Sequence, residues 1–229
     1  MKQPVPYDLD HLPLLGEGSR RKCYRLPDGQ RCVKFYRRPS EYTKKTTWSV
    51  ALHIGLARFV PLLNVNCHEW RYHRVLRRRL PADLFAVFPE SIEPVYSREC
   101  GWGIVETLIQ NADGTPMRRV IAEMGLAQDQ GLRRRLYAEA ESLFRRLAEQ
   151  AVCFYDPPNL MVQWTGPGMF RLRVVDFEPQ GRALIPGLSS IKPYVRSKVR
   201  RRCARYLRRL RETYFPDGVH ATGAAMTVQ

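Results

Sequence analysis

Short apolar runs separated by turn residues occupy the N-terminal part of the chain, a pattern typical of β-strands joined by tight turns. Leu15–Tyr24 is a glycine-containing turn that enters a strand, and Pro27–Gly29 is a hairpin turn. Arg31–Tyr36 then returns as the next strand, and Ile104–Ile109 has the composition of a further one. We therefore expect a β-rich segment from Leu14 to about Leu108, with one or two inserted helices.

Apolar residues at three- and four-residue steps predict helices elsewhere. The expected helices are Glu41–Val60, Asn66–Leu80, Gln128–Val152 and Lys192–Thr213. The last of these has an apolar stripe made of Val195, Val199, Cys203, Leu207 and Leu210. We expect this stripe to pack on the protein while the surrounding arginines face solvent. Strands followed mainly by helices predict an α+β fold.

A second hairpin is predicted near the C-terminal third of the chain. Trp164–Gly168 has turn chemistry, so the apolar segments on either side of it pair as strands. Asn159 precedes the first strand and Asp176 follows the second, so the hairpin brings both residues to the same end of the sheet. One carboxylate and one amide oxygen are ligands that suit Mg²⁺ bridging phosphate groups. We interpret Asn159 and Asp176 as a metal-binding pair.

Candidate phosphate-binding residues lie upstream of this hairpin. Gly16 and Gly18 form a tight turn that could hold phosphate, and Lys34 stands within an apolar strand. A lysine there needs a carboxylate or a phosphate, and Glu69 is the candidate partner. The order of these residues with Asn159 and Asp176 is the order found in protein kinases. It predicts a bilobal kinase-like fold, with a small β-rich N-lobe at 1–108, a mainly helical C-lobe at 109–215 and a flexible tail at 216–229.

The chain also resembles a known family. The segment Cys23–Arg25, the turn at Pro27–Gly29 and the strand Gln30–Lys34 resemble the YrbL family of PhoP-network proteins, and the resemblance extends over nearly the whole chain. That family is grouped with kinase-like folds. The resemblance implies ATP and Mg²⁺ as cofactors, and it implies the fold more firmly than an activity. After the strand Ile104–Ile109, Gln110–Pro116 is expected to be a hinge between the lobes, and its part Gln110–Gly114 is expected to contact the base.

Two features depart from an active kinase. Arg21 stands where a third glycine would let the backbone approach phosphate, and Phe154 occupies the position of the catalytic-loop aspartate. Phenylalanine cannot accept a proton. Asp156 is the only nearby substitute, and it serves as a catalytic base only if the Pro157-Pro158 loop turns its carboxylate inward. The alternative interpretation is that Asp156 caps its own loop.

Composition limits the choice of partners and compartment. The net charge of +16 predicts contact with polyanions such as nucleic acid, anionic lipid, phosphosugar or nucleotide. The six cysteines show no metal-binding spacing. Val50–Val65, the most apolar window, is interrupted by polar residues and is not a spanning helix. Lacking a leader pattern at its start, the chain is expected to be a reduced, cytoplasmic protein.

Three functions remain open from the sequence. The leading one is a nucleotide-binding phosphotransferase that acts on an unknown protein or sugar acceptor. The second is a pseudokinase scaffold, which Phe154 favours. The third is a non-catalytic module that binds a polyanion through its basic surface, above all through the arginines of the last predicted helix: Arg200, Arg201, Arg205, Arg208 and Arg209.

Overall fold

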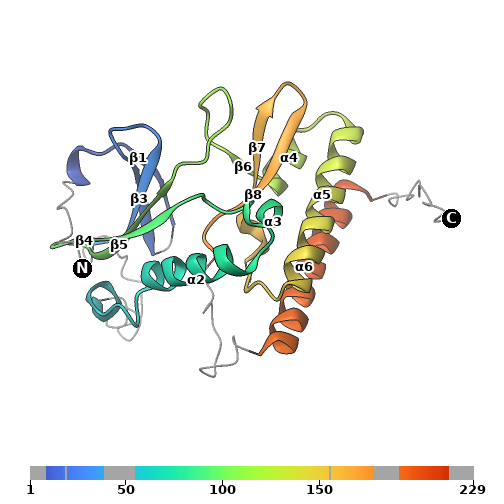
Figure 1. Ribbon diagram of the computed structural model, residues 1–229. Coiled ribbons are helices and arrows are strands. Elements are labelled where there is room, and N and C mark those ends of the chain that lie inside the picture. Colours follow the sequence, from blue (N-terminus) through green and yellow to red (C-terminus); the bar gives the residue numbers. More distant parts are fainter. Residues whose placement is uncertain (1–8, 19, 39–54, 155, 178–190, 217–229) are drawn as a thin grey trace.

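An antiparallel sheet of five strands forms the N-terminal part of the molecule in a computed structural model that describes residues 9–18, 20–38, 55–154, 156–177 and 191–216 (Figure 1). In spatial order the strands are β1 (Leu14–Glu17), β2 (Arg21–Arg25), β3 (Arg31–Tyr36), β5 (Gly101–Thr107) and β4 (Ile92–Ser97). The predicted hairpin between β2 and β3 is confirmed. Gly29 makes that turn with φ of 68°, a left-handed conformation that glycine adopts without strain.

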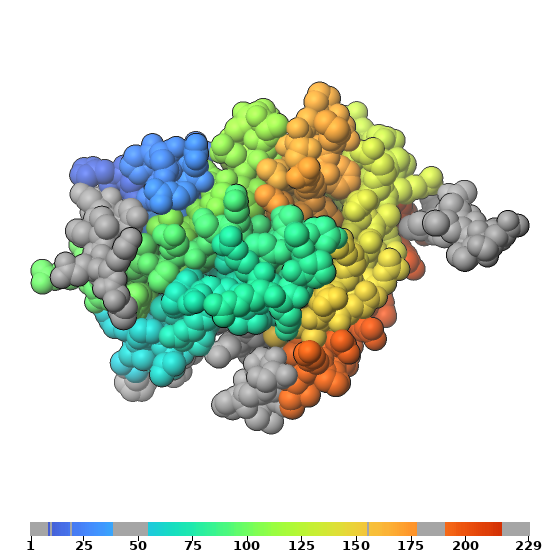
Figure 2. Space-filling view, in the orientation of Figure 1, coloured from blue at the N-terminus to red at the C-terminus, as the bar shows by residue number. Residues whose placement is uncertain are grey.

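Helix α2 (Val65–Arg79) packs against β4 and β5 and is followed by the short α3 (Ala82–Phe85). In Figure 2, α2 crosses the visible face between the N-terminal strands and the C-terminal helices. Asn64 caps α2, because its side chain accepts a hydrogen bond of 3.2 Å from the N–H of Cys67. The predicted helix at 66–80 is thus confirmed to within one residue at each end. Of the predicted helix at 41–60, residues 55–59 are helical and most of the remainder lies outside the described residues.

A second antiparallel sheet contains β6 (Arg118–Arg119), β7 (Leu160–Gly166) and β8 (Met169–Val174). The predicted second hairpin is therefore confirmed, with β7 extending further than expected. A short 3₁₀ helix, η3 (Pro157–Asn159), leads into β7. Helices of this part are α4 (Val120–Leu126), α5 (Gln130–Glu149) and α6 (Lys192–Tyr214), and α5 and α6 run side by side (Figure 1).

The apolar interior includes a large cluster of buried side chains and a smaller one. The large cluster joins residues of α2, α4, α5, α6 and the second sheet, and it includes the fully buried Phe154 and Leu147. The smaller cluster lies in the five-stranded sheet around Val33, Phe35 and Val105. Gly103 permits this packing, since a Cβ there would lie 2.5 Å from the Phe35 ring. The mixture of antiparallel sheets and helices is α+β, as the sequence predicted.

The last helix packs largely as predicted. Val195, Val199, Cys203 and Leu210 are buried, and Tyr206 is buried where Leu207 was expected to be. The five arginines expected to bind anions are exposed: Arg200, Arg201, Arg205, Arg208 and Arg209. Across the part of the chain that the structure describes, no helix combines the length and apolarity needed to cross a membrane. All six cysteines are free thiols, and only Cys23 is not buried.

Candidate functional site

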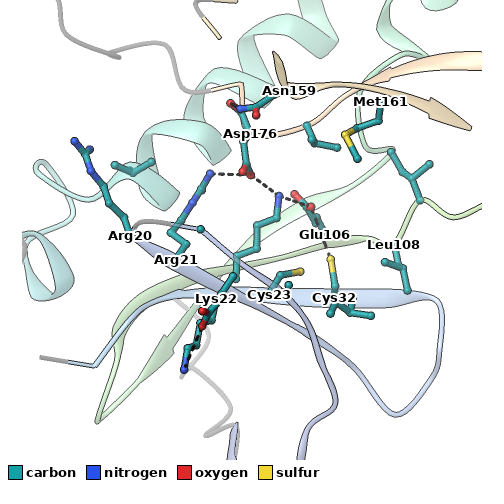
Figure 3. A pocket seen from close by; sticks show the side chains of 18 of the residues that line it. Arg20, Arg21, Lys22, Cys23, Cys32, Glu106, Leu108, Asn159, Met161 and Asp176 are labelled. Carbon is teal, nitrogen blue, oxygen red and sulfur yellow. Dashed lines mark hydrogen bonds and ion pairs between the residues drawn. The ribbon is translucent and has the colours of Figure 1, made fainter. Parts of the chain in front are cut away.

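A cavity of about 810 Å³ lies where the five-stranded sheet faces the β7–β8 hairpin (Figure 3). Residues of both sheets line it, although they are far apart in the sequence. Most of the site residues predicted from the sequence line this cavity: Gly16, Gly18, Lys34, Asp156, Asn159 and Asp176. Glu69 does not line the cavity, but it forms an ion pair with Arg21, which does.

Lys34 connects the two sides of the cavity. It is buried on β3, and its Nζ lies 2.8 Å from Oδ1 of Asp176 and 2.6 Å from Oε1 of Glu106. Burial of an ammonium group disfavours its charged form, but the charges of Asp176, Glu106 and Glu69 outweigh that effect and raise the pKa of Lys34 well above its ordinary value. Lys34 is therefore protonated at neutral pH. Lys34 and Asp176 thus both face the cavity.

Asp176 has an unusual backbone conformation that positions its carboxylate. It follows β8 with φ of 52°, in the left-handed region where aspartate and asparagine are tolerated better than most residues. The next residue, Phe177, is buried and packs edge-on against Phe88 at 4.8 Å, which anchors the segment. Asn159 lies beside it: its carbonyl accepts from the N–H of Val175 at 3.2 Å, and its amide donates to the carbonyl of Asp176 at 3.4 Å.

Arg21, and not Lys34, is the ion-pair partner found for Glu69. Nη1 of Arg21 lies 2.6 Å from Oε2 of Glu69 and donates to Oδ1 of Asn66 at 3.0 Å. Nη2 of the same side chain lies 2.8 Å from Oδ1 of Asp176 (Figure 3). The predicted pairing of Lys34 with Glu69 is corrected accordingly, because Arg21 at the start of β2 reaches α2 first. Arg21, which departs from the glycine pattern, is thus a central residue of the site.

The resulting ion-pair network consists of Arg21, Lys34, Glu69, Glu106 and Asp176. Desolvation would raise the pKa of Asp176, but the charges of Arg21 and Lys34 outweigh it and hold this pKa well below its usual range. Burial raises the pKa of Glu106, and the nearby Lys34 only partly opposes the shift. One oxygen each of Glu69 and Glu106 is buried without a hydrogen-bond partner. The network therefore contains carboxylates whose hydrogen bonding is incomplete.

Sequence reasoning missed Glu106. It lies on β5, opposite Cys32 of β3, and the Cys32 thiol lies 3.7 Å from Oε1 of Glu106 (Figure 3). A signal was present, because Glu106 interrupts the apolar run Ile104–Ile109 just as Lys34 interrupts its own strand. Two opposite charges on adjacent buried strands predict an ion pair.

The chain leaving β5 forms the apolar end of the cavity. Thr107, Leu108, Ile109 and Gln110 line it, whereas the rest of the expected base-binding segment, 111–114, does not. That segment instead forms a turn in which the N–H of Gly114 donates to the carbonyl of Asn111 at 2.9 Å. Of the segment Gln110–Gly114 that was expected to contact a base, only Gln110 lines the cavity, and the base contact itself stays a prediction. Leu15, Met117, Met161 and Val175 also line the cavity, so it could accommodate a flat apolar ring.

The loop before β7 separates Phe154 from Asp156. Phe154 is fully buried in the large cluster and stacks on Phe144 at a centroid distance of 6.0 Å. Asp156 is exposed and lines the cavity, and its carbonyl accepts from the N–H of Asn159 at 2.9 Å. The position of Asp156 is thus compatible with both roles considered from the sequence. Its backbone carbonyl organises the loop, as a cap would, and its carboxylate is open to the cavity, as a catalytic base requires.

The predicted metal pair fits magnesium only in part. Asp176 and Asn159 supply the oxygen donors that Mg²⁺ prefers, but Oδ1 of Asp176 is already contacted by two cations. Among the described residues, no group of three or more His, Cys, Asp or Glu side chains is placed to hold a metal ion. A metal would have to use Oδ2 of Asp176. The magnesium role of this pair stays a prediction.

Comparison with known proteins gave no relative from which to transfer a function: neither the protein-family models nor the curated proteins contain a match to the chain.

Proposed function

We propose that this protein is a kinase-like nucleotide-binding protein that holds ATP in the cavity between its two sheets. The observation that carries the proposal is the convergence of Lys34, Asn159 and Asp176, from three separate elements, beside the Gly16–Gly18 turn. The apolar end at 107–110 would take the base, and the cationic end would take the phosphates.

The arrangement of elements supports a bilobal kinase-like fold and the resemblance to the YrbL family. In this proposal the five-stranded sheet and α2 are the small lobe at 1–108, and the helices and second sheet are the larger lobe at 109–215. The cavity is lined by residues from both parts, and the large hydrophobic cluster continues from α2, β4 and β5 into the larger lobe. A cleft between lobes is where kinases bind nucleotide.

Transfer of the γ-phosphoryl group to a protein or sugar hydroxyl is the activity that this site would support. Such reactions depend mainly on positioning and on stabilisation of charge, which Lys34 and Arg21 supply. Asp156 is the exposed carboxylate available to orient an acceptor hydroxyl. Asp176 and Asn159 would hold a magnesium ion, which would neutralise negative charge on the phosphates.

The test is thermal unfolding with Mg·ATP and, for comparison, with tripolyphosphate. A ligand at about one hundred times its Kd stabilises the folded state by about 2.7 kcal/mol, which corresponds to a Tm rise of about 5–10 °C for a chain of this size. We expect this rise with ATP and its loss in Lys34→Gln. Arg31→Gln, on the same hairpin but outside the cavity, should keep it. Equal stabilisation by tripolyphosphate that survives Lys34→Gln would contradict a nucleotide site.

A non-catalytic scaffold is the second candidate, and the burial of Phe154 favours it. A phenylalanine held in the large cluster cannot take the proton of an acceptor, so ATP would bind without turnover. Release of ADP during incubation with ATP separates the two functions. Turnover that disappears in Asp156→Asn while binding persists would establish that the site cleaves ATP with the help of Asp156, and binding without turnover would establish the scaffold.

A further inference from the structure

Arg21 and Lys34 both contact the carboxylate of Asp176, the residue predicted to bind a metal ion. Oδ1 of Asp176 lies 2.8 Å from Nη2 of Arg21 and 2.8 Å from Nζ of Lys34. A carboxylate oxygen has about two lone-pair sites, so both are used. A divalent cation could bind Oδ1 only by displacing Arg21 or Lys34.

Neither cation is easily displaced. Arg21 is held at its other nitrogen by Glu69, which is fully buried and has one oxygen without a partner. Lys34 likewise holds the buried Glu106. Removing one partner of a buried ion pair is strongly destabilising, because it leaves an uncompensated charge inside the protein. We therefore expect Arg21 and Lys34 to stay in place when a ligand enters.

Both cations retain donors for a ligand. An ammonium group has three N–H donors and a guanidinium has five. Lys34 uses two, on Glu106 and Asp176, which leaves one. Arg21 uses three, on Asn66, Glu69 and Asp176, which leaves two. Both side chains line the cavity, and a guanidinium matches the geometry of phosphate oxygens.

The charge balance of the cavity is compatible with an added anion. The ion-pair network alone has three carboxylates and two cations. Among the described residues, however, seven Lys or Arg side chains and four Asp or Glu side chains line the cavity, and one of the seven is Arg119 on β6. Arg119 lies close enough to lower the pKa of Asp176 through its charge. Phosphate groups entering here would therefore meet cations on both sides of the cavity.

Building on the proposed nucleotide site, we propose that Arg21 and Lys34 bind the phosphate chain of the nucleotide without a divalent cation, with Arg21 taking the place that a metal ion would have on Asp176. Nucleotide binding and phosphoryl transfer then have different requirements. Side chains supply the positive charge that binds the nucleotide, and a metal ion is needed only for a subsequent transfer of the phosphoryl group.

The decisive measurement is calorimetric titration of the full chain with ATP, in excess EDTA and in excess magnesium. We expect the two Kd values to agree within about threefold. A larger weakening in EDTA would overturn the inference while leaving the nucleotide site intact. Absence of binding in both conditions would reject the inference together with the proposed function, so the two failures can be told apart.

Two variants make the test specific. Asp176→Asn keeps the left-handed backbone and removes a negative charge beside the phosphates, so it should bind ATP in EDTA at least as tightly as the wild type. Loss of binding by this variant in EDTA would show that the two cations do not bind the phosphates without the Asp176 carboxylate, and would overturn the inference. Arg21→Gln combined with Glu69→Gln removes the cation without leaving a buried charge, and should weaken ATP binding in EDTA by about tenfold or more.

The control for the double variant is Arg31→Gln, which removes an exposed cation from the same hairpin outside the cavity and should leave both Kd values unchanged. Melting of each ligand-free variant shows whether it is folded. If the double variant does not fold, Asp176→Asn decides the question alone, because Asp176 is partly exposed and its backbone conformation is preserved.

Discussion

Asp176 stabilises the folded protein through charge, and the effect should depend on pH. Arg21 and Lys34 lower its pKa below the value of about 3.9 expected in the unfolded chain. A carboxyl group with a depressed folded-state pKa stabilises the protein above its unfolded pKa, and this stabilisation is lost as the pH falls towards the folded value. Asp176→Asn should therefore lower Tm at pH 7, and its difference from wild type should shrink below about pH 4.

Melting curves across this range check the prediction, since all other titrating groups are shared by the two proteins. Asp156→Asn is the matched control, because Asp156 is exposed and makes no ion pair with the described residues. It should melt like the wild type at every pH. A Tm difference for Asp176→Asn that is the same at pH 3 and pH 7 would show that charge is not its origin.

At the scale of an element, α6 should separate anion binding from stability. Arg201, Arg205, Arg208 and Arg209 are exposed, so changing all four to glutamine should weaken salt-dependent retention on heparin without lowering Tm. On the opposite face, Leu210 is fully buried. Leu210→Ala should cost about 2–5 kcal/mol of the free energy of unfolding and leave retention unchanged.

Unchanged retention of the four-arginine variant would place the anion-binding surface elsewhere. The alternative is the exposed surface of α2, where five arginines lie: Arg71, Arg74, Arg77, Arg78 and Arg79. The corresponding glutamine variant of α2 distinguishes the two helices.

At the scale of the whole molecule, the position of the cavity predicts which backbone amides a bound ATP would protect from hydrogen exchange. Residues of β1–β3 and of the β7–β8 side line one cavity, so a bound nucleotide contacts both parts. Hydrogen exchange should slow on ATP addition in the strands of the five-stranded sheet and around Asn159 together. Protection confined to α6 would instead identify ATP as a surface-bound polyanion. Repeating the experiment with Lys34→Gln should remove the protection.

Much of this arrangement could be predicted, because charges within apolar strands are strong signals. The order of Lys34, Glu69, Asn159 and Asp176 along the chain, which matches that of protein kinases, predicts a common site, and Lys34 and Asp176 lie 2.8 Å apart. The helix carrying Glu69 was likewise predicted, as was the hairpin that brings Asn159 beside Asp176.

The identity of each ion-pair partner could not be predicted. Arg21 and Lys34 lie near the same carboxylates, and which cation reaches Glu69 depends on where α2 crosses the sheet. That position follows from the tertiary packing of α2 on β4 and β5, and no local pattern encodes it. The turn at 111–114 was misassigned for a related reason: the buried side chain of Asn111 bonds to Thr115 and Trp164 and withdraws the segment from the cavity.

The left-handed backbone at Asp176 has a consequence for sequence variation. Glycine would accept this conformation but would remove the carboxylate, whereas glutamate would keep the charge in a conformation that longer side chains rarely adopt. Asparagine would preserve the shape alone. Aspartate is thus the residue that satisfies both requirements at position 176. Among natural variants of this chain, asparagine at this position would mark a protein that has kept the architecture of the cavity and has lost the charge at its centre.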